Sequence, residues 1–149
     1  MSSELQDLYQ EVILDHNRRP RNFRVIEDGS SAEGFNPLCG DRVTVYLKVE
    51  NGTIKDVSFQ GAGCAISKAS ASLMTESVKG KTVEEAGALF ERFQRMITAP
   101  ADSPTEGLGK LTVLAGVRQF PVRVKCATLA WHTLRSAVDA PGGGTVSTE

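Results

Sequence analysis

The stretch Val-Thr-Val-Tyr-Leu-Lys-Val-Glu-Asn-Gly-Thr-Ile-Lys-Asp-Val-Ser-Phe, residues 43–59, carries the clearest structural signal in the chain. Apolar and polar residues alternate from Val43 to Val49, which is the period of a half-buried strand. Asn51-Gly52 is the dipeptide most typical of a tight two-residue hairpin turn. Residues 54–60 then return as a partner strand. We therefore predict an antiparallel hairpin with one face on the core.

The segments around this hairpin have mostly helical periodicity. Residues 30–37 precede the hairpin and are typical of a short strand or loop that leads into a turn. Helices are predicted over residues 3–16, 64–79, 83–97, 107–117 and 121–138. Thr82 and Glu85 form a capping-box signature at the start of one of them. Strands followed by a run of helices indicate an α+β fold, in which helices pack on one face of a small antiparallel sheet of about three strands.

Length and composition limit the function classes. The chain has 149 residues, a formal net charge of -1, and 40% hydrophobic residues. We predict one domain over residues 1–139 and a flexible C-terminal tail over 140–149, which contains Pro141-Gly-Gly-Gly. The charge gives no field that would recruit nucleic acid, and no apolar run approaches the roughly 20 residues that span a bilayer. The acidic start of the chain is unlike a signal peptide, so we expect a cytoplasmic protein.

Three cysteines are an odd number, so disulfide pairing would leave one over. Cys39 lies in a turn before the first clear strand, Cys64 lies where the second strand hands over to a helix, and Cys126 lies near the start of the last helix. Helix N-termini favour the thiolate, so we expect lowered pKa values at Cys64 and Cys126. The spacing alone leaves two interpretations equally open: a metal or reactive site, and three unrelated buried thiols.

The hairpin predicts that some of these residues meet. Cys39 and Asp41 precede its first strand and Cys64 follows its second, so all three should lie at the same end; tertiary packing would have to bring in Cys126. Three thiolates and one carboxylate are ligands that zinc accepts in tetrahedral geometry, and soft sulfur ligands also suit iron–sulfur clusters. Such a set is negatively charged. We expect Arg123 to pair with Asp41, and Lys125 to support the site from beside Cys126.

Other polar and aromatic residues have simpler interpretations. His16 is expected to end the first helix, and His132 to have a surface or capping role rather than bind metal. Trp131 is expected in the core or at an interface. The basic residues Arg18, Arg19, Arg21 and Arg24 form either a solvated face or a docking surface for an acidic partner.

Three separated motifs in the chain resemble the IscU/SufU family of iron–sulfur cluster assembly proteins, which is related to the NifU N-terminal domain. They are Asn-Pro-Leu-Cys-Gly-Asp at 36–41, Gly-Ala-Gly-Cys-Ala-Ile-Ser at 61–67 and Val-Lys-Cys-Ala-Thr-Leu-Ala-Trp at 124–131. The opening residues 8–16 and Pro20-Arg-Asn-Phe also match, so the resemblance covers nearly the whole chain to about Val138. It implies a SufE/NifU-like α+β fold.

Within that family the residues are more similar to the SufU branch. The IscU type has a histidine before the last cysteine, where this chain has Lys125. It also has a Leu-Pro-Pro-Val segment read by a chaperone, where this chain has Gln-Phe-Pro-Val at 119–122. The stretch 91–119 is longer than the IscU type requires.

The resemblance implies a site and a function. Cys39, Asp41, Cys64 and Cys126 would bind zinc, and Cys39 would accept sulfur from a pyridoxal-phosphate cysteine desulfurase (SufS-like) and pass it toward a downstream cluster scaffold. This function is that of a zinc-dependent sulfurtransferase. One alternative is a scaffold that binds iron and a transient [2Fe-2S] cluster at the same cysteines. Another is a zinc-stabilised interaction domain without sulfur chemistry.

Overall fold

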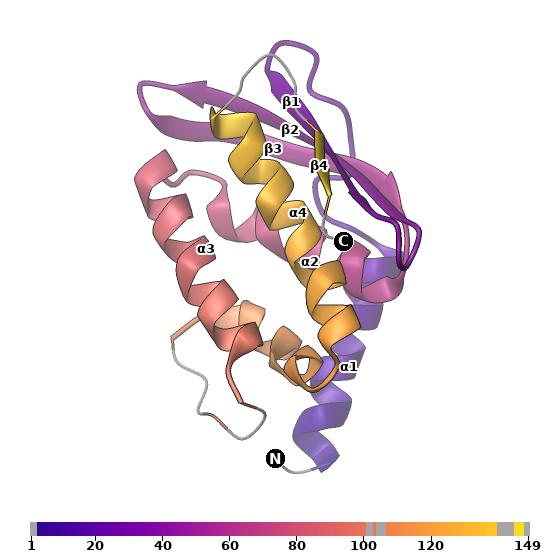
Figure 1. Ribbon diagram of the computed structural model, residues 1–149. Coiled ribbons are helices and arrows are strands. Elements are labelled where there is room, and N and C mark those ends of the chain that lie inside the picture. Colours follow the sequence, from indigo (N-terminus) through magenta and orange to yellow (C-terminus); the bar gives the residue numbers. More distant parts are fainter. Residues whose placement is uncertain (1–2, 101–102, 104–106, 140–144, 148–149) are drawn as a thin grey trace.

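A computed structural model of the chain describes residues 3–100, 103, 107–139 and 145–147. Its elements, in chain order, are α1 (Ser3–Arg18), β1 (Ser30–Asn36), β2 (Asp41–Glu50), β3 (Thr53–Ala62), α2 (Ala65–Val78), α3 (Val83–Thr98), the 3-10 helix η1 (Gly109–Gln119), α4 (Pro121–Asp139) and β4 (Thr145–Ser147). The predicted α+β class is confirmed (Figure 1).

The hairpin of β2 and β3 forms where the sequence predicts it. Asn51 and Gly52 have φ angles of 53° and 75°, the left-handed conformation that a tight hairpin turn requires. β1 pairs antiparallel with β2, so three antiparallel strands form as expected. The inward face of β2 carries Val43, Val45 and Leu47, all buried. Alternation along the strand therefore sets which face meets the core.

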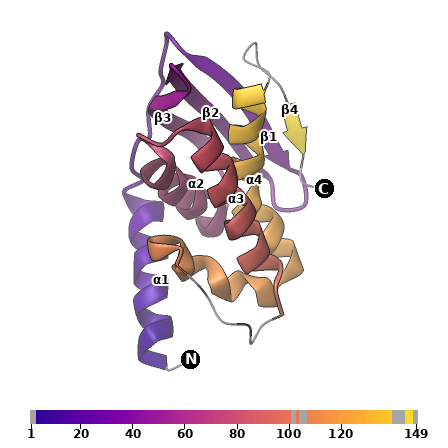
Figure 2. The ribbon, with the colours of Figure 1, turned by 90° about the vertical axis from the view of Figure 1, so that its left-hand side faces the viewer.

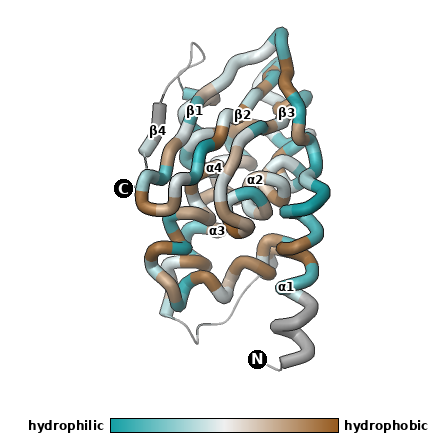
Figure 3. Tube along the Cα trace, turned by 90° about the vertical axis from the view of Figure 1, so that its right-hand side faces the viewer, coloured by the Kyte–Doolittle hydropathy of each residue, from teal (hydrophilic) through white to brown (hydrophobic). Residues whose placement is uncertain are grey.

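The helices cover one face of the sheet, as predicted (Figures 1 and 2). α4 packs against β1 and β2, α2 packs against β3, and α1 packs against α2. Trp131 on α4 is fully buried and stacks on Phe93 of α3, with ring centroids 4.7 Å apart. Figure 3 shows how hydrophobic and hydrophilic residues alternate along these elements. None of the helices in the described part of the chain is long and apolar enough to cross a membrane.

The end of the chain differs from the prediction. Residues 145–147 form β4, which pairs in parallel with Glu33–Phe35 of β1, whereas the sequence predicts a flexible tail over 140–149. The strand order is therefore β3-β2-β1-β4. Without β4, the outer edge of β1 would present unpaired backbone groups, and even a three-residue segment can bond to such an edge. The remaining tail residues, 140–144 and 148–149, lie outside the described residues.

Candidate metal centre

The turn between β1 and β2 holds the first cysteine. Asn36 and Asp41 face each other across the two strands, and the Cys39 backbone N–H donates to the Asn36 carbonyl oxygen at 3.3 Å. Gly40 has a φ of 70°, which suits a residue without a side chain. The turn leaves Cys39 half-buried and places Asp41, which is 1% exposed, at the inward-facing start of β2.

The second cysteine begins α2. Cys64 is the N-cap residue, and its Sγ accepts the backbone N–H of Ser67 at 3.4 Å. The preceding Gly63 lies so close to Asp41 that a Cβ there would stand 2.4 Å from Asp41 Oδ1. The absence of a side chain lets Asp41 Oδ1 accept the Cys64 backbone N–H at 2.8 Å. This close approach explains why a glycine precedes the cysteine.

Tertiary packing places the third cysteine, Cys126, next to Cys39. Cys126 is fully buried on α4, and its Sγ lies 3.2 Å from Cys39 Sγ. One ligand atom from each of Cys39, Asp41 and Cys126 lies within 4.8 Å of the others. Cys64 Sγ is outside this group of three, but it lies 3.9 Å from Asp41 Oδ2. The structure therefore brings together all four residues that the motifs pointed to, with Cys64 at the margin.

The donor set fits a tetrahedral zinc ion. Thiolates bound to zinc at about 2.3 Å in a tetrahedron lie about 3.8 Å from one another. The Cys39 and Cys126 sulfurs are 3.2 Å apart, which is shorter than that spacing, and Cys64 Sγ lies 3.9 Å from the carboxylate oxygen Oδ2 of Asp41. Three sulfur donors equally suit an iron–sulfur cluster, so the geometry supports a metal site without choosing the metal.

Burial shifts the pKa of the Cys126 thiol in the direction opposite to the one expected from its position in a helix. Burial, followed by hydrogen bonding to Asp41 and Cys39, strongly raises the pKa of the Cys126 thiol. The predicted lowering of this pKa is wrong, because Cys126 lies in the second turn of α4, beyond the reach of the helix dipole, in a site that excludes water. A thiolate at this position needs a compensating cation, and a bound metal would supply one.

Arg123 is part of the site, but with a different partner from the predicted one. Among the described residues it forms no ion pair with Asp41. Its pKa is instead raised by a hydrogen bond to Cys126 and by the charges of Cys64 and Cys126. The reason is positional: Arg123 is exposed at the mouth of the site, whereas Asp41 is buried below and is bonded to Cys64. Lys125 is half-buried beside Cys126.

The basic residues after α1 are largely paired within the chain. Asp15 accepts from Arg19 at 2.9 Å and from Arg21 at 2.7 Å, and Arg24 donates to Asp56 at 2.6 Å. Arg18 is exposed and forms no ion pair within the described part of the chain. The predicted docking surface at Arg18, Arg19 and Arg21 stays a prediction, with fewer free charges than the sequence suggested.

The two histidines lie elsewhere and are less exposed than predicted. His16 is 3% exposed, and its Nδ1 lies 2.7 Å from Ser72 Oγ on α2. α1 continues to Arg18, so His16 does not end the helix. His132 is half-buried with its ring against the edge of Phe90. Both side chains serve packing because their helices turn them inward.

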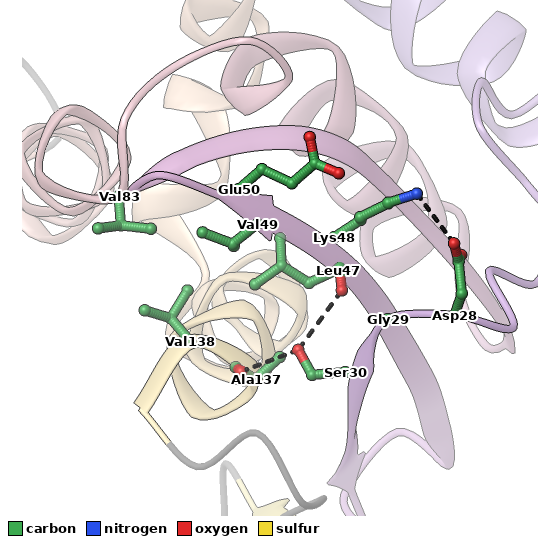
Figure 4. A pocket seen from close by; sticks show the side chains of 10 residues that line it. All are labelled: Asp28, Gly29, Ser30, Leu47, Lys48, Val49, Glu50, Val83, Ala137 and Val138. Carbon is green, nitrogen blue, oxygen red and sulfur yellow. Dashed lines mark hydrogen bonds and ion pairs between the residues drawn. The ribbon is translucent and has the colours of Figure 1, made fainter.

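The described residues also line a groove at the opposite end of β2. It has a volume of about 670 Å³ and is lined by Leu47–Glu50, by residues 28–30, and by Val83, Ala137 and Val138 (Figure 4). Ser30 Oγ contacts the carbonyl oxygens of Leu47 and Ala137, and Lys48 pairs with Asp28 at 2.9 Å. These polar groups are satisfied within the chain, so the groove presents no cluster of free ligands comparable to the cysteine site.

Comparisons with known proteins agree with this architecture. The model of the NifU-like N-terminal domain family matches residues 8–140. The chain is 40% identical to the zinc-dependent sulfurtransferase SufU of Bacillus subtilis, over 96% of this chain and 97% of that protein. It is also 40% identical to the iron–sulfur cluster assembly scaffold protein IscU of Streptococcus pyogenes, over 91% of this chain and 86% of that protein. A NifU-like N-terminal structure from Brucella abortus superposes with a TM-score of 0.78 and 28% identity, covering 92% of this chain and 96% of that one.

A small α+β domain with cysteines and an aspartate gathered at the end of its hairpin defines a class of iron–sulfur cluster assembly proteins. This chain belongs to that class, as a member of the NifU-like N-terminal domain (IscU/SufU) family.

Proposed function

We propose that this protein is a zinc-dependent sulfurtransferase, which accepts persulfide sulfur from a cysteine desulfurase and relays it for cluster assembly. Zinc would be held by Cys39, Asp41, Cys64 and Cys126. The observation that supports the proposal most directly is the contrast between two neighbouring sulfurs: Cys39 is reachable from solvent, while Cys126, 3.2 Å away, is fully buried. Such a site can present one sulfur to a partner while others hold a metal.

The chemistry assigned to Cys39 is a thiolate exchange. The Cys39 thiolate attacks the terminal sulfur of the desulfurase persulfide, a new sulfur–sulfur bond forms at Cys39, and the bond within the partner's persulfide breaks. The partner's cysteine leaves as a thiolate, so no external oxidant or reductant is needed. When bound, zinc keeps thiol ligands deprotonated at neutral pH. Arg123, exposed beside the sulfurs, stabilises negative charge as the transfer proceeds.

An apolar rim supports docking of a partner over Cys39. We define the rim as Leu38, Phe120 and Val122, which are 63%, 60% and 49% exposed. Leu38 adjoins Cys39 in the turn before β2, and Phe120 and Val122 lie at the start of the helix that carries Cys126, so the rim comes from two segments that carry site cysteines. Large exposed apolar side chains gathered around a reactive group are typical of a protein interface. The proposed occupant is the desulfurase, a pyridoxal-phosphate enzyme, because it must bring its persulfide to Cys39.

A second candidate function is a scaffold for a transient [2Fe-2S] cluster at the same residues. The three sulfur donors favour it, and a relative of equal identity is named as a scaffold. Two features support the sulfurtransferase: Lys125, where the IscU type has a histidine, and the long 91–119 segment, which holds η1. Either function depends on free thiols, which a reducing cytoplasm maintains, and we propose that location.

The test combines metal analysis with sulfur transfer. The purified protein should be colourless and contain zinc, and desulfurase with cysteine should produce a persulfide on Cys39, detected by mass spectrometry. Cys39→Ser should abolish the transfer. Brown protein that holds iron in place of zinc would favour the scaffold, and zinc-loaded protein that gains no persulfide would favour a zinc-stabilised interaction domain.

The rim can be tested separately. Val122→Asp should reduce stimulation of the desulfurase, because it places a charge in the apolar contact. Val25→Asp is the matched control, since Val25 is 47% exposed and lies in the segment between α1 and β1, outside the segments that carry the cysteines. Equal losses in both variants would argue against docking at the rim.

A further inference from the structure

Asn36 lies against the ligand cluster, although no sequence pattern assigns it a role beyond the turn. It is the last residue of β1 and is fully buried. Its Nδ2 donates to Asp41 Oδ2 at 3.3 Å and lies 3.3 Å from Cys126 Sγ. One amide nitrogen therefore contacts two of the residues assigned to the metal.

The other end of the amide is unpaired. Asn36 Oδ1 is buried and has no hydrogen-bond partner among the described residues. A buried acceptor without a partner is unfavourable, so the orientation of the amide needs a reason. Rotating the amide by half a turn would bring Oδ1 toward Asp41 Oδ2 and Cys126 Sγ. The amide oxygen, an acceptor, would then face a carboxylate and a sulfur, which is repulsive when these groups are anionic. The observed orientation is thus the one that suits charged ligands.

We propose that Asn36 is a positioning residue for the metal centre, one that donates its two amide hydrogens to Asp41 and to the Cys126 thiolate. These bonds fix the carboxylate from the side opposite its bond with the Cys64 backbone. They also disperse the excess negative charge of three thiolates and one carboxylate. A neutral amide does this without the desolvation cost of burying a further ion. This inference rests on the proposed function, because it requires that the site binds a metal. It adds Asn36 as a residue that positions the ligands of that metal.

Two substitutions test the effect of the Asn36 hydrogen-bond donor separately from the effect of its side-chain shape. Asn36→Leu keeps a similar volume without a donor, and Asn36→Asp keeps the shape but offers only acceptors. Loss of a bond that supports a metal ligand commonly weakens binding about 10- to 100-fold. We expect at least that loss of Zn²⁺ affinity for Asn36→Leu and a larger one for Asn36→Asp, measured by competition with a chromophoric chelator.

A spectroscopic measurement excludes a merely structural effect. In the Co²⁺-loaded protein, the sulfur-to-cobalt charge-transfer bands should shift in Asn36→Leu, because the donor to Cys126 sulfur is lost. Thr133→Val is the matched control. Thr133 is also fully buried on α4, and among the residues that the structure describes its hydroxyl bonds only to the Leu129 carbonyl oxygen. This control should lower thermal stability but leave Zn²⁺ affinity and the Co²⁺ spectrum unchanged.

The outcomes are distinguishable. Wild-type affinity and a wild-type Co²⁺ spectrum in both Asn36 variants would overturn this inference alone. Wild-type protein that binds no Zn²⁺ would overturn the proposed function and this inference with it. If Asn36→Leu does not fold, Asn36→Ser, which retains one donor, should bind Zn²⁺ with reduced affinity; unchanged affinity there would equally overturn the inference.

Discussion

The carboxylate of Asp41 accepts the backbone N–H of Cys64 at 2.8 Å. This bond joins the first residue of β2 to the N-cap of α2, and it occupies Oδ1, so that Oδ2 faces Asn36 and the sulfurs. The carboxylate is therefore held by the protein on one side and is available to a metal on the other. The contact depends on Gly63, since any side chain there would meet Asp41.

Gly63→Ala should displace the Asp41 carboxylate. The added Cβ would lie 2.4 Å from Oδ1 and 3.1 Å from the Asp41 Cα. We expect Zn²⁺ affinity to fall about 10- to 100-fold, as for other losses of ligand support, in a chelator competition. Gly87→Ala is the control, because nothing lies within 4 Å of a Cβ at that position on α3. It should stabilise the protein by about 0.5–1 kcal/mol in urea unfolding, with metal binding intact. Equal Zn²⁺ affinity in the two variants would show that Asp41 tolerates the intrusion.

Removal of metal should loosen one end of the molecule and leave the rest folded. The proposed ligands lie in the turn before β2, at the start of β2, at the N-cap of α2 and in the second turn of α4. The largest fully buried side chains, such as Trp131 and Phe93, instead pack between the helices. With EDTA we expect an unchanged far-UV circular dichroism spectrum at 25 °C, a lower Tm, and faster hydrogen exchange at residues 37–41 and 63–66. Saturating metal at a hundred times its Kd stabilises by about 2.7 kcal/mol. Global unfolding on chelation would contradict this expectation.

Stability should decrease as pH falls below about 6.5 because of His16. Burial lowers the pKa of His16 in the folded protein, with the nearby Arg21 charge acting in the same direction and that of Glu76 against it. Above the unfolded pKa the imidazole is neutral in both states, so its contribution is fully present. As pH falls through the unfolded and then the folded pKa, the unfolded chain binds the proton first and stability is lost.

The measurement is urea unfolding with a chelator present between pH 7.5 and 5. His16→Gln should show a shallower decline than wild type. His132→Gln serves as a comparison. Burial also lowers the pKa of His132, so this residue should account for a separate part of the loss of stability as the pH falls. The carboxyl groups of Asp15 and Asp56 have lowered pKa values and titrate below this range. A slope in His16→Gln identical to wild type would refute the assignment.

Ser70→Ala should destabilise the core by about 1–3 kcal/mol, because it leaves a buried donor unpaired. Trp131 Nε1 donates to Ser70 Oγ at 3.2 Å, and both residues are fully buried. Trp131 is the only tryptophan in the chain, so its fluorescence reports the change directly. Ser77→Ala is the control: Ser77 also lies on α2 and bonds a backbone carbonyl, but it is half-buried, and within the described part of the chain its hydroxyl forms no hydrogen bond with the indole. Similar losses in both variants would assign the effect to α2 rather than to the indole bond.

The local elements of this fold were predictable because each has a short-range cause. Alternation and Asn51-Gly52 specify the hairpin, and the capping box at Thr82 and Glu85 forms as predicted at the start of α3. β4 was not predictable, since a three-residue strand has no pattern of its own and forms only on the edge of β1. The burial of His16 against α2 was not predictable either, although its position in a helix was.

For the site, local sequence patterns were enough to predict the donor types and the meeting of Cys39, Asp41 and Cys64 at one end of the hairpin, because a tight turn returns the chain alongside itself. The remaining features of the site depend on tertiary packing. Packing of α4 on β1 and β2 brings Cys126 within 3.2 Å of Cys39 and buries it, which raises the pKa of its thiol. It also places Asn36 between Asp41 and Cys126. Burial and long-range contact arise from the whole chain, and no local pattern encodes them.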